Sequence, residues 1–160
     1  MLNSILIFHI SGIQVVHLKR KDFMDSKESD GNLMSGFLSA LCEFFRKVVN
    51  PVKVIKFQEG EVFFEHHQNF IICVFFGSFD QYSEYRKTHE ELAYPVQYIG
   101  YQKQIILQTH RAFIRYCQNH GITINSDVSQ IDEERLKECL KASINIQDCE
   151  PNAIEILQFT

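Results

Sequence analysis

Three short apolar segments in the middle of the chain are joined by connections too short for anything but antiparallel pairing. The segments are VKVIKF (residues 52–57), EVFFE (61–65) and NFIICVFF (69–76), and the connections between them read QEG and HHQ. Parallel neighbours need a crossover of about a dozen residues, so these connections predict an antiparallel meander. The third segment is apolar on both faces, which predicts a central strand that is covered.

Two further apolar runs open the chain, at residues 5–10 and 13–18, with Ser11-Gly12 between them. Glycine supplies the positive φ that a tight turn needs, so the pattern predicts a β-hairpin. The stretch DFMDSKESDGN (residues 22–32) that follows is polar and predicts an exposed loop.

The segment NLMSGFLSALCEFFRKVVNP (residues 32–51) has the periodicity of an amphipathic helix that ends at Asn50-Pro51. Its polar side carries Glu43, Arg46 and Lys47. The expected buried stripe recurs at steps of three and four and consists of Met34, Phe37, Leu38, Leu41, Phe45 and Val48.

Helical spacing returns after the meander. Residues 81–93 form a polar helical stretch that is broken at Tyr94-Pro95, and residues 96–119 predict a long helix ending near Gly121. Its expected buried stripe is Ile99, Ile106, Phe113 and Cys117. A short helix is expected at residues 130–142, with Ser129 and Asp132 in the spacing of a capping box.

Composition limits the classes of protein to which the chain can belong. It has 160 residues, of which 45% are hydrophobic and 22% charged, which predicts a single domain over residues 1–160 with a core at 2–120 and a C-terminal extension at 121–160. The five cysteines are odd in number and widely spaced, as is typical of reduced thiols in the cytoplasm.

Charge and hydropathy limit the kinds of partner and the location that we expect. The net charge is −4 and there is no long basic run, so nucleic acid is not expected to bind. The longest apolar run, residues 70–76, is far shorter than the roughly 20 residues of a membrane span. The apolar start has no positive side chain before it and is interrupted by His9, which is unlike a signal peptide. We therefore expect a cytoplasmic protein.

The order of these elements resembles the longin fold, a relative of the roadblock fold. The segments ILIFHISGIQVV, LMSGFLSAL and VIKFQEGEVFFEHHQNFIICVFF are similar to the first hairpin, the first helix and the meander of longin-like chains, closest to small stand-alone archaeal proteins. The resemblance covers residues 2–76. It implies an α/β fold of the α+β type, a five-stranded antiparallel sheet with helices on both faces in the order β-β-α-β-β-β-α-α.

The resemblance also implies a function. Longin and roadblock domains occur in regulators of small GTPases, in coat and tethering complexes, and at the start of some SNAREs; residues 121–160 lack the sustained heptads of a SNARE helix. We therefore expect a non-enzymatic protein-interaction module for vesicle-trafficking-type assemblies. It would form a homodimer or dock with a small GTPase or with another longin or roadblock subunit. The alternative is a small-ligand sensor with a pocket between the sheet and helix 96–119, lined by His110 and tyrosines.

Two stretches are candidates for the interaction surface. The first predicted helix carries a strip of small residues, which either packs tightly on the sheet or contributes to an interface. By resemblance to roadblock dimers, the candidate residues on this helix are Ser35, Ser39, Cys42, Glu43 and Arg46. In the stretch after the meander, Tyr82, Tyr85 and Arg86 are residue types enriched at interfaces, although an amphipathic turn closing over the sheet would have the same pattern.

No residue pattern indicates an enzyme, a cofactor or a metal site. His66 and His67 are adjacent in a predicted strand and point to opposite faces, and no CxxC or HExxH spacing accompanies them. Cys42, Cys73 and Cys117 have no recognisable nucleophile context, and a cysteine-dependent enzyme, the third alternative, would need a thiol that reacts with alkylating agents much faster than a model thiol. The phosphate-binding patterns GxxxxGK[ST] and GxGxxG are absent, so the chain is not expected to be a GTPase itself.

Overall fold

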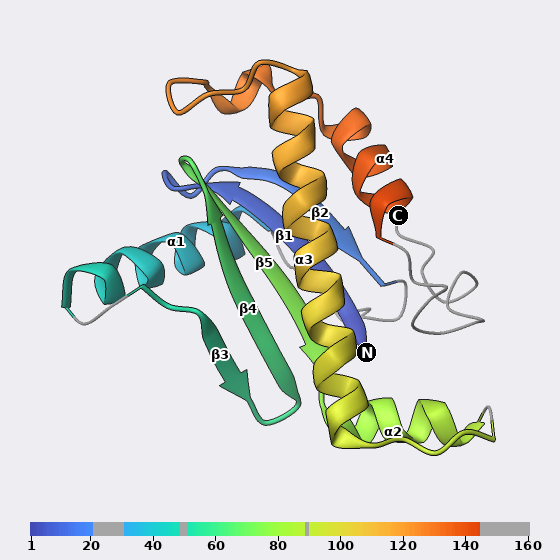
Figure 1. Cartoon of the computed structure of the whole chain (residues 1–160). Coiled ribbons are helices and arrows are strands. Elements are labelled where there is room, and N and C mark those ends of the chain that lie inside the picture. Colours follow the sequence, from blue (N-terminus) through green and yellow to red (C-terminus); the bar gives the residue numbers. More distant parts are fainter. Residues whose placement is uncertain (21–30, 49–50, 89, 145–160) are drawn as a thin grey trace.

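The computed structural model describes residues 1–20, 31–48, 51–88 and 90–144. Most of the predicted loop at residues 22–32 and the tail from residue 145, with Cys149, lie outside the described residues. Five strands and four α-helices follow one another along the described part (Figure 1): β1 Leu2–His9, β2 Gln14–Lys19, α1 Gly31–Val48, β3 Val54–Phe57, β4 Gly60–His67, β5 Phe70–Gly77, α2 Phe79–Thr88, α3 Pro95–Asn119 and α4 Glu133–Ser143, with a 3-10 turn at Val128–Gln130 before α4.

The strands form one antiparallel sheet in the order β2-β1-β5-β4-β3. The predicted hairpin and meander are both confirmed. They are joined through β1 and β5, whose register places Ile5 opposite Val74 and Ile7 opposite Ile72. The predicted fold class, a five-stranded antiparallel sheet of the α+β type, is therefore correct, and three α-helices rather than two follow β5 in the described residues.

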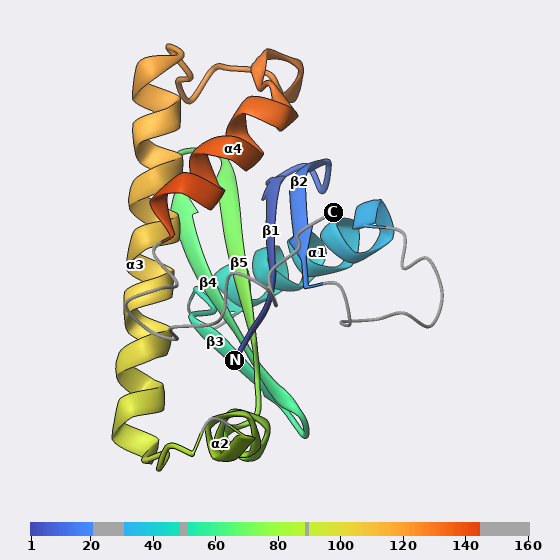
Figure 2. The ribbon, with the colours of Figure 1, turned by 90° about the vertical axis from the view of Figure 1, so that its right-hand side faces the viewer.

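Strand β5 is the central strand, as its unbroken apolar sequence predicts. Ile72, Val74 and Phe76 are buried in the larger core, on the side of the sheet that α3 and α4 cover. Ile71 and Cys73 are buried in a smaller core beneath α1. Figure 2 shows the arrangement edge-on, with α1 on one side of the sheet and α3 and α4 on the other.

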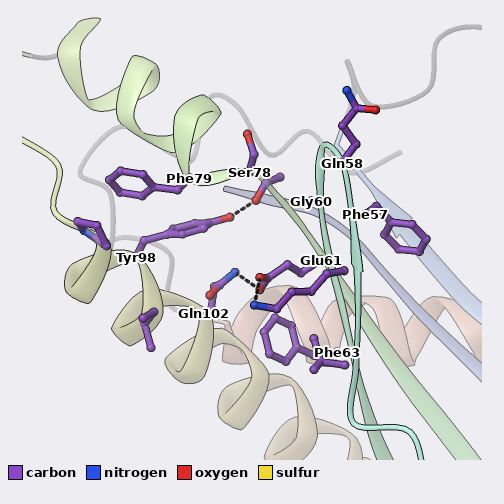
Figure 3. A pocket seen from close by; sticks show the side chains of 14 residues that line it. Phe57, Gln58, Gly60, Glu61, Phe63, Ser78, Phe79, Tyr98 and Gln102 are labelled. Atoms are coloured by element: carbon purple, nitrogen blue, oxygen red, sulfur yellow. Dashed lines mark hydrogen bonds and ion pairs between the residues drawn. The ribbon is translucent and has the colours of Figure 1, made fainter.

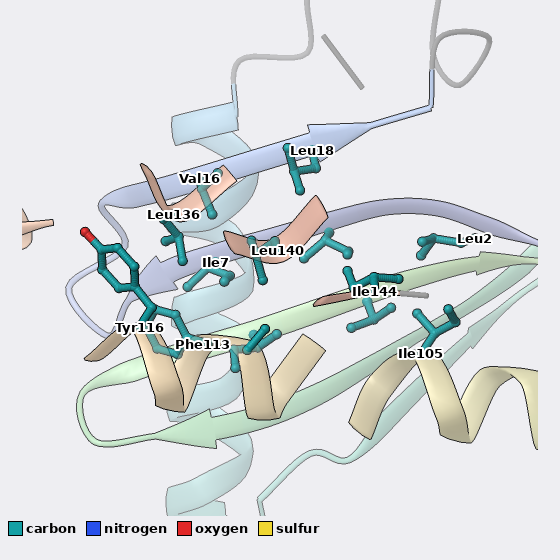
Figure 4. Packing of buried hydrophobic residues seen from close by; sticks show 14 of the residues in the cluster. Leu2, Ile7, Val16, Leu18, Ile105, Phe113, Tyr116, Leu136, Leu140 and Ile144 are labelled. Atoms are coloured by element: carbon teal, nitrogen blue, oxygen red, sulfur yellow. The ribbon is translucent and has the colours of Figure 1, made fainter. Parts of the chain in front are cut away.

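The larger core includes the C-terminal helix. Leu136 and Leu140 of α4 are fully buried and pack with Ile7 and Val16 of the hairpin (Figure 4). Helix α4 begins later than predicted because the side chain of Asp132 accepts a hydrogen bond from Arg135 N at 3.2 Å and caps the helix there. Ser129, the other residue of the predicted capping box, lies in the preceding 3-10 turn.

Helix α3 has its predicted length but turns a different face to the sheet near its start. Ile99 is 50% exposed, whereas Tyr98 and Tyr101 are buried. The hydroxyl of Tyr98 donates to the carbonyl of Gly77, and that of Tyr101 accepts from Leu2 N at 3.1 Å. The tyrosines are therefore held by backbone groups at the ends of β5 and β1.

Hydropathy along the helices agrees with the absence of a long apolar run in the sequence. Within the described ranges, no helix combines the length and the apolarity that crossing a membrane requires.

Candidate functional site

The small residues of α1 pack against the turn of the N-terminal hairpin. Ser35 and Ser39 are buried, and their hydroxyls donate to the carbonyls of Gly12, at 2.7 Å, and of Ile10. Gly12 has a φ of +88°, and a Cβ added there would lie 3.0 Å from the Cα of Gly36. Of the two interpretations of the strip, close packing describes these positions. The expectation that Ser35 and Ser39 offer an exposed interaction surface is therefore corrected.

Cys42 is also buried, at 7% exposure, in the smaller core that contains Cys73. Burial raises the pKa of the Cys42 thiol to about 11, and burial followed by the proximity of Cys42 raises the pKa of Cys73. Burial likewise raises the pKa of Cys117 to about 11. These thiols stay protonated at neutral pH, and Cys42 does not belong to an open surface.

Glu43 and Arg46 lie at the surface, as expected. The Arg46 guanidinium donates two hydrogen bonds to the Glu43 carboxylate, at 2.9 and 3.1 Å, and the Lys47 ammonium is 3.2 Å from the same group. The hydrogen bonds from Arg46 and Lys47 hold the pKa of Glu43 below its ordinary value. Ion pairs this exposed contribute little to stability, so a partner that breaks the pair to bind either side chain would cost the fold little.

The structure brings four of the five predicted α1 residues to one small cavity of about 180 Å³. The opposite wall comes from the region of the β4–β5 turn. The cavity is smaller than a typical ligand pocket, and its size suits a single side chain. Its lining includes Ser39, Cys42, Glu43, Arg46, Val52, His66 and Asn69.

The outward-facing side of α1 carries two large exposed side chains. Phe37 is 65% exposed and Phe44 is 58% exposed, with the exposed Ala40 between them. We call Phe37, Ala40 and Phe44 the outer face of α1. The sequence placed Phe37 in the buried stripe, which is wrong. The helix instead turns Ser35 and Ser39 to the hairpin turn, which their small side chains allow it to approach closely.

The second predicted surface is mostly interior. Tyr82 is 2% exposed and its ring stacks on Tyr98 with centroids 4.6 Å apart. The Arg86 guanidinium lies 5.9 Å from the centre of the Tyr82 ring and forms a 2.8 Å ion pair with Glu91. Tyr85 is half-buried. Helix α2 closes over the end of the sheet, so the exposed surface expected at Tyr82 and Arg86 is corrected.

A larger groove lies between the β3–β4 hairpin and the start of α3 (Figure 3); the sequence suggested a pocket between the sheet and this helix, but not its place at the β3–β4 hairpin, and His110 does not line it. Its volume is about 520 Å³, within the range of ligand-binding sites. Polar groups meet on one side, where the Glu61 carboxylate lies 3.3 Å from Lys56 Nζ and accepts from Gln102 Nε2 at 3.3 Å. The apolar lining includes Val54, Phe57, Phe63, Phe79 and Ile99.

The histidines of β4 face opposite sides of the sheet, as predicted. His66 lines the small cavity under α1, whereas the ring of His67 lies 6.4 Å from that of His110 on α3. Burial and the nearby His110 lower the pKa of His67. Nδ1 of His110 is 4.0 Å from the Glu65 carboxylate. Over the part of the chain that the structure describes, no three His, Cys, Asp or Glu side chains are grouped so as to hold a metal ion.

Comparison of the sequence with protein-family models and with curated proteins gives no match. The structure itself defines the class: an α+β protein with a five-stranded antiparallel sheet and helices on both faces.

Proposed function

We propose that this chain is a non-enzymatic protein-interaction module that docks with a small GTPase or with another longin or roadblock subunit, or forms a homodimer. The order of its first six elements, ββαβββ, resembles that of longin-like domains, and three α-helices follow them in the described residues. One observation carries the proposal: the outer face of α1 exposes Phe37 and Phe44 two helical turns apart.

This surface has the composition of a docking site. A phenylalanine offers about 150–250 Å² for burial, and aromatic residues are enriched at protein interfaces. Ala40 lies between the two rings and lets a partner approach the helix backbone. Lys47 follows Phe44 by three residues and so lies beside this apolar strip, with its ammonium paired to Glu43, in the place of the polar rim that surrounds an interface core.

The test is light-scattering mass over a concentration series, for the protein alone and mixed with small GTPases of the same organism in their GDP and GTP forms. We expect a dimer or a nucleotide-dependent complex that the double variant Phe37→Glu, Phe44→Glu abolishes. The control is Leu107→Glu, on α3, because Leu107 is also exposed, at 47%. A complex that the double variant still forms refutes the role of the outer face of α1. A monomer that ignores every GTPase refutes the homodimer and GTPase forms of the proposal and favours the second candidate function below.

The groove between β3 and α3 favours the second candidate function, a small-ligand sensor. Its volume of about 520 Å³ is sufficient for a metabolite, and Tyr98 lines it, although His110 does not. A rise in melting temperature with a metabolite panel, in a protein that stays monomeric, would support this function instead.

A further inference from the structure

Strand β3 forms one edge of the sheet, with no described strand beyond it (Figure 1). The register of β3 on β4 determines which backbone N–H and C=O groups of β3 form hydrogen bonds with β4. Phe64 N donates to Lys53 O at 2.9 Å, and Val54 lies opposite Phe63. In an antiparallel ladder this phase turns the N–H and C=O of Ile55 toward β4. The N–H and C=O of Val54 and Lys56 therefore point away from the sheet.

The side chains along this edge are exposed in a way that suits an added strand. Val54 is 39% exposed and Phe57 is 57% exposed. Short length and lysines are devices that keep an edge strand from aggregating, and β3 has both, in its four residues with Lys56 among them and Lys53 just before. The edge is therefore protected against indiscriminate pairing while its hydrogen-bonding groups remain available to a matched segment.

The groove of about 520 Å³ adjoins the same edge. Val54 and Lys56 contribute one wall, and Ile99 of α3 contributes to the lining from the other element. Val54 shares its face of the sheet with Phe63, which lies opposite it in the ladder. Side chains of an added strand on this face would enter the groove, whereas alternate side chains would point to the face on which Lys53 and Ile55 lie.

We propose that the β3 edge binds an extended segment of a partner protein as a sixth strand, with apolar side chains in the groove and acidic side chains beside Lys53. This inference rests on the proposed function, in that the partner is a protein. It names a second surface, separate from the outer face of α1.

The chemistry of the edge determines the choice of occupant. A small apolar molecule would fill the groove but leave the N–H and C=O of Val54 and Lys56 to water, whereas a strand satisfies them in the same register. The acidic positions follow from charge. Lys53 is exposed on the α1 side of the edge, and its charge contributes, after burial, to lowering the pKa of His66. A carboxylate there is complementary to the Lys53 ammonium.

The probe is a short labelled peptide that alternates glutamate with valine or phenylalanine, titrated by fluorescence anisotropy. The variants are Lys56→Pro and Val54→Pro, because proline at either position removes an N–H that faces away from β4 and spares the ladder. We expect each to weaken binding at least tenfold. The matched control Lys56→Gln removes the same charge and the ion pair with Glu61 but keeps the N–H, and we expect it to bind within about threefold of the wild type.

Two further measurements make the test independent of how the proline variants fold. A peptide N-methylated at alternate amides is unable to complete the ladder and should fail to bind the wild-type protein. Ile99→Glu, which places a charge in the groove, should weaken binding at least tenfold. Circular dichroism melting identifies any variant that is unfolded.

Several results would overturn the proposal: no binding of the alternating peptide, equal binding of the N-methylated peptide, or no effect of Ile99→Glu. Wild-type dimers that Lys56→Pro dissociates would show that the edge serves a second copy of this chain instead. The variant Phe37→Glu, Phe44→Glu should bind the peptide normally. Failure of docking through α1 and failure at the β3 edge are thus read out separately.

Discussion

Gly12 and Gly36 are in contact, yet replacing each by alanine should change stability in opposite directions. Gly12, in the turn between β1 and β2, has a φ of +88°, and a Cβ there would lie 3.0 Å from the Cα of Gly36 in α1. A Cβ on Gly36 would have no atom within 4 Å. The two substitutions therefore test whether the glycine of the turn or the glycine of the helix sets the close approach.

The expected change in the free energy of unfolding follows from the surroundings of each glycine. At Gly12, alanine in a left-handed conformation costs about 1–2 kcal/mol. The short contact adds to this, because α1 is held by buried hydrogen bonds from Ser35 and Ser39, each worth about 1 kcal/mol. Alanine also restricts the unfolded chain more than glycine does, which offsets about 0.4–1 kcal/mol of this loss of stability. We expect Gly12→Ala to lose about 2 kcal/mol and Gly36→Ala, inside a helix, to gain up to about 1 kcal/mol.

Urea unfolding followed by circular dichroism measures both changes. In a protein of this size, 1 kcal/mol corresponds to about 2–4 °C in melting temperature, so Gly12→Ala should melt about 4–8 °C lower. Gly12→Ala with wild-type stability, or Gly36→Ala destabilised by more than about 1 kcal/mol, would refute the packing described for α1 on the hairpin.

Two other substitutions test a buried histidine and the C-terminal helix. Burial, with Lys19 nearby, lowers the pKa of His17 from 6.5 to about 4. As the pH falls from 6.5 to 4, His17 takes up a proton in the unfolded chain before it does so in the folded protein. The free energy of unfolding should therefore fall by on the order of 2–3 kcal/mol over this range from its value above pH 6.5. His17→Gln should flatten this part of the pH profile of unfolding free energy, and an unchanged slope would contradict the assignment. Leu136→Ala should cost about 2–5 kcal/mol in the same urea assay because Leu136 is fully buried. The exposed Leu107→Ala should change stability by less than about 0.5 kcal/mol, and equal effects would place α4 outside the cooperative core.

The strands and their connections could be predicted from the sequence because short turns leave few ways to pair neighbours. The short connections QEG and HHQ between apolar runs predict a meander. Strand β5 is apolar on both faces, which predicts its central place in the sheet. These features are local, since each depends on residues a few positions apart. The boundaries of α3 were also close, at Pro95 and Asn119, whereas α2 ends at Thr88, five residues before the end of the helical stretch predicted for 81–93.

The faces of the helices could not be predicted in the same way. Periodicity identified an apolar stripe on α1 that contains Phe37, yet the hairpin turn, far away in sequence, accepts hydrogen bonds from Ser35 and Ser39 and selects the small-residue side. On α3, backbone groups at the ends of β1 and β5 bind the tyrosine hydroxyls and leave Ile99 outside. In both cases a polar contact between distant segments decided the rotation of the helix.

The groove between β3 and α3 also depends on contacts between segments that are distant in the sequence. Its lining comes from β3, β4, the end of β5 and the first turns of α3, and no single segment carries a recognisable pattern. Two signals in the sequence point toward it after the fact. Val54 and Phe57 are large apolar residues in the outermost strand, and Ile99 lies on a helix whose tyrosines take the buried positions.

The pairing of β1 with β5 also has a consequence for how the chain reaches its native state. The hairpin β1–β2 and the meander β3–β4–β5 contain only contacts between near neighbours in sequence, so each is able to form early. The register from Leu2↔Phe76 to His9↔Phe70 joins them across the whole segment that includes α1. Closing that long loop carries the main entropic cost of assembling the sheet. The row of side chains from Ile5 and Val74 to Ile7 and Ile72 is thus where two locally formed pieces become one sheet.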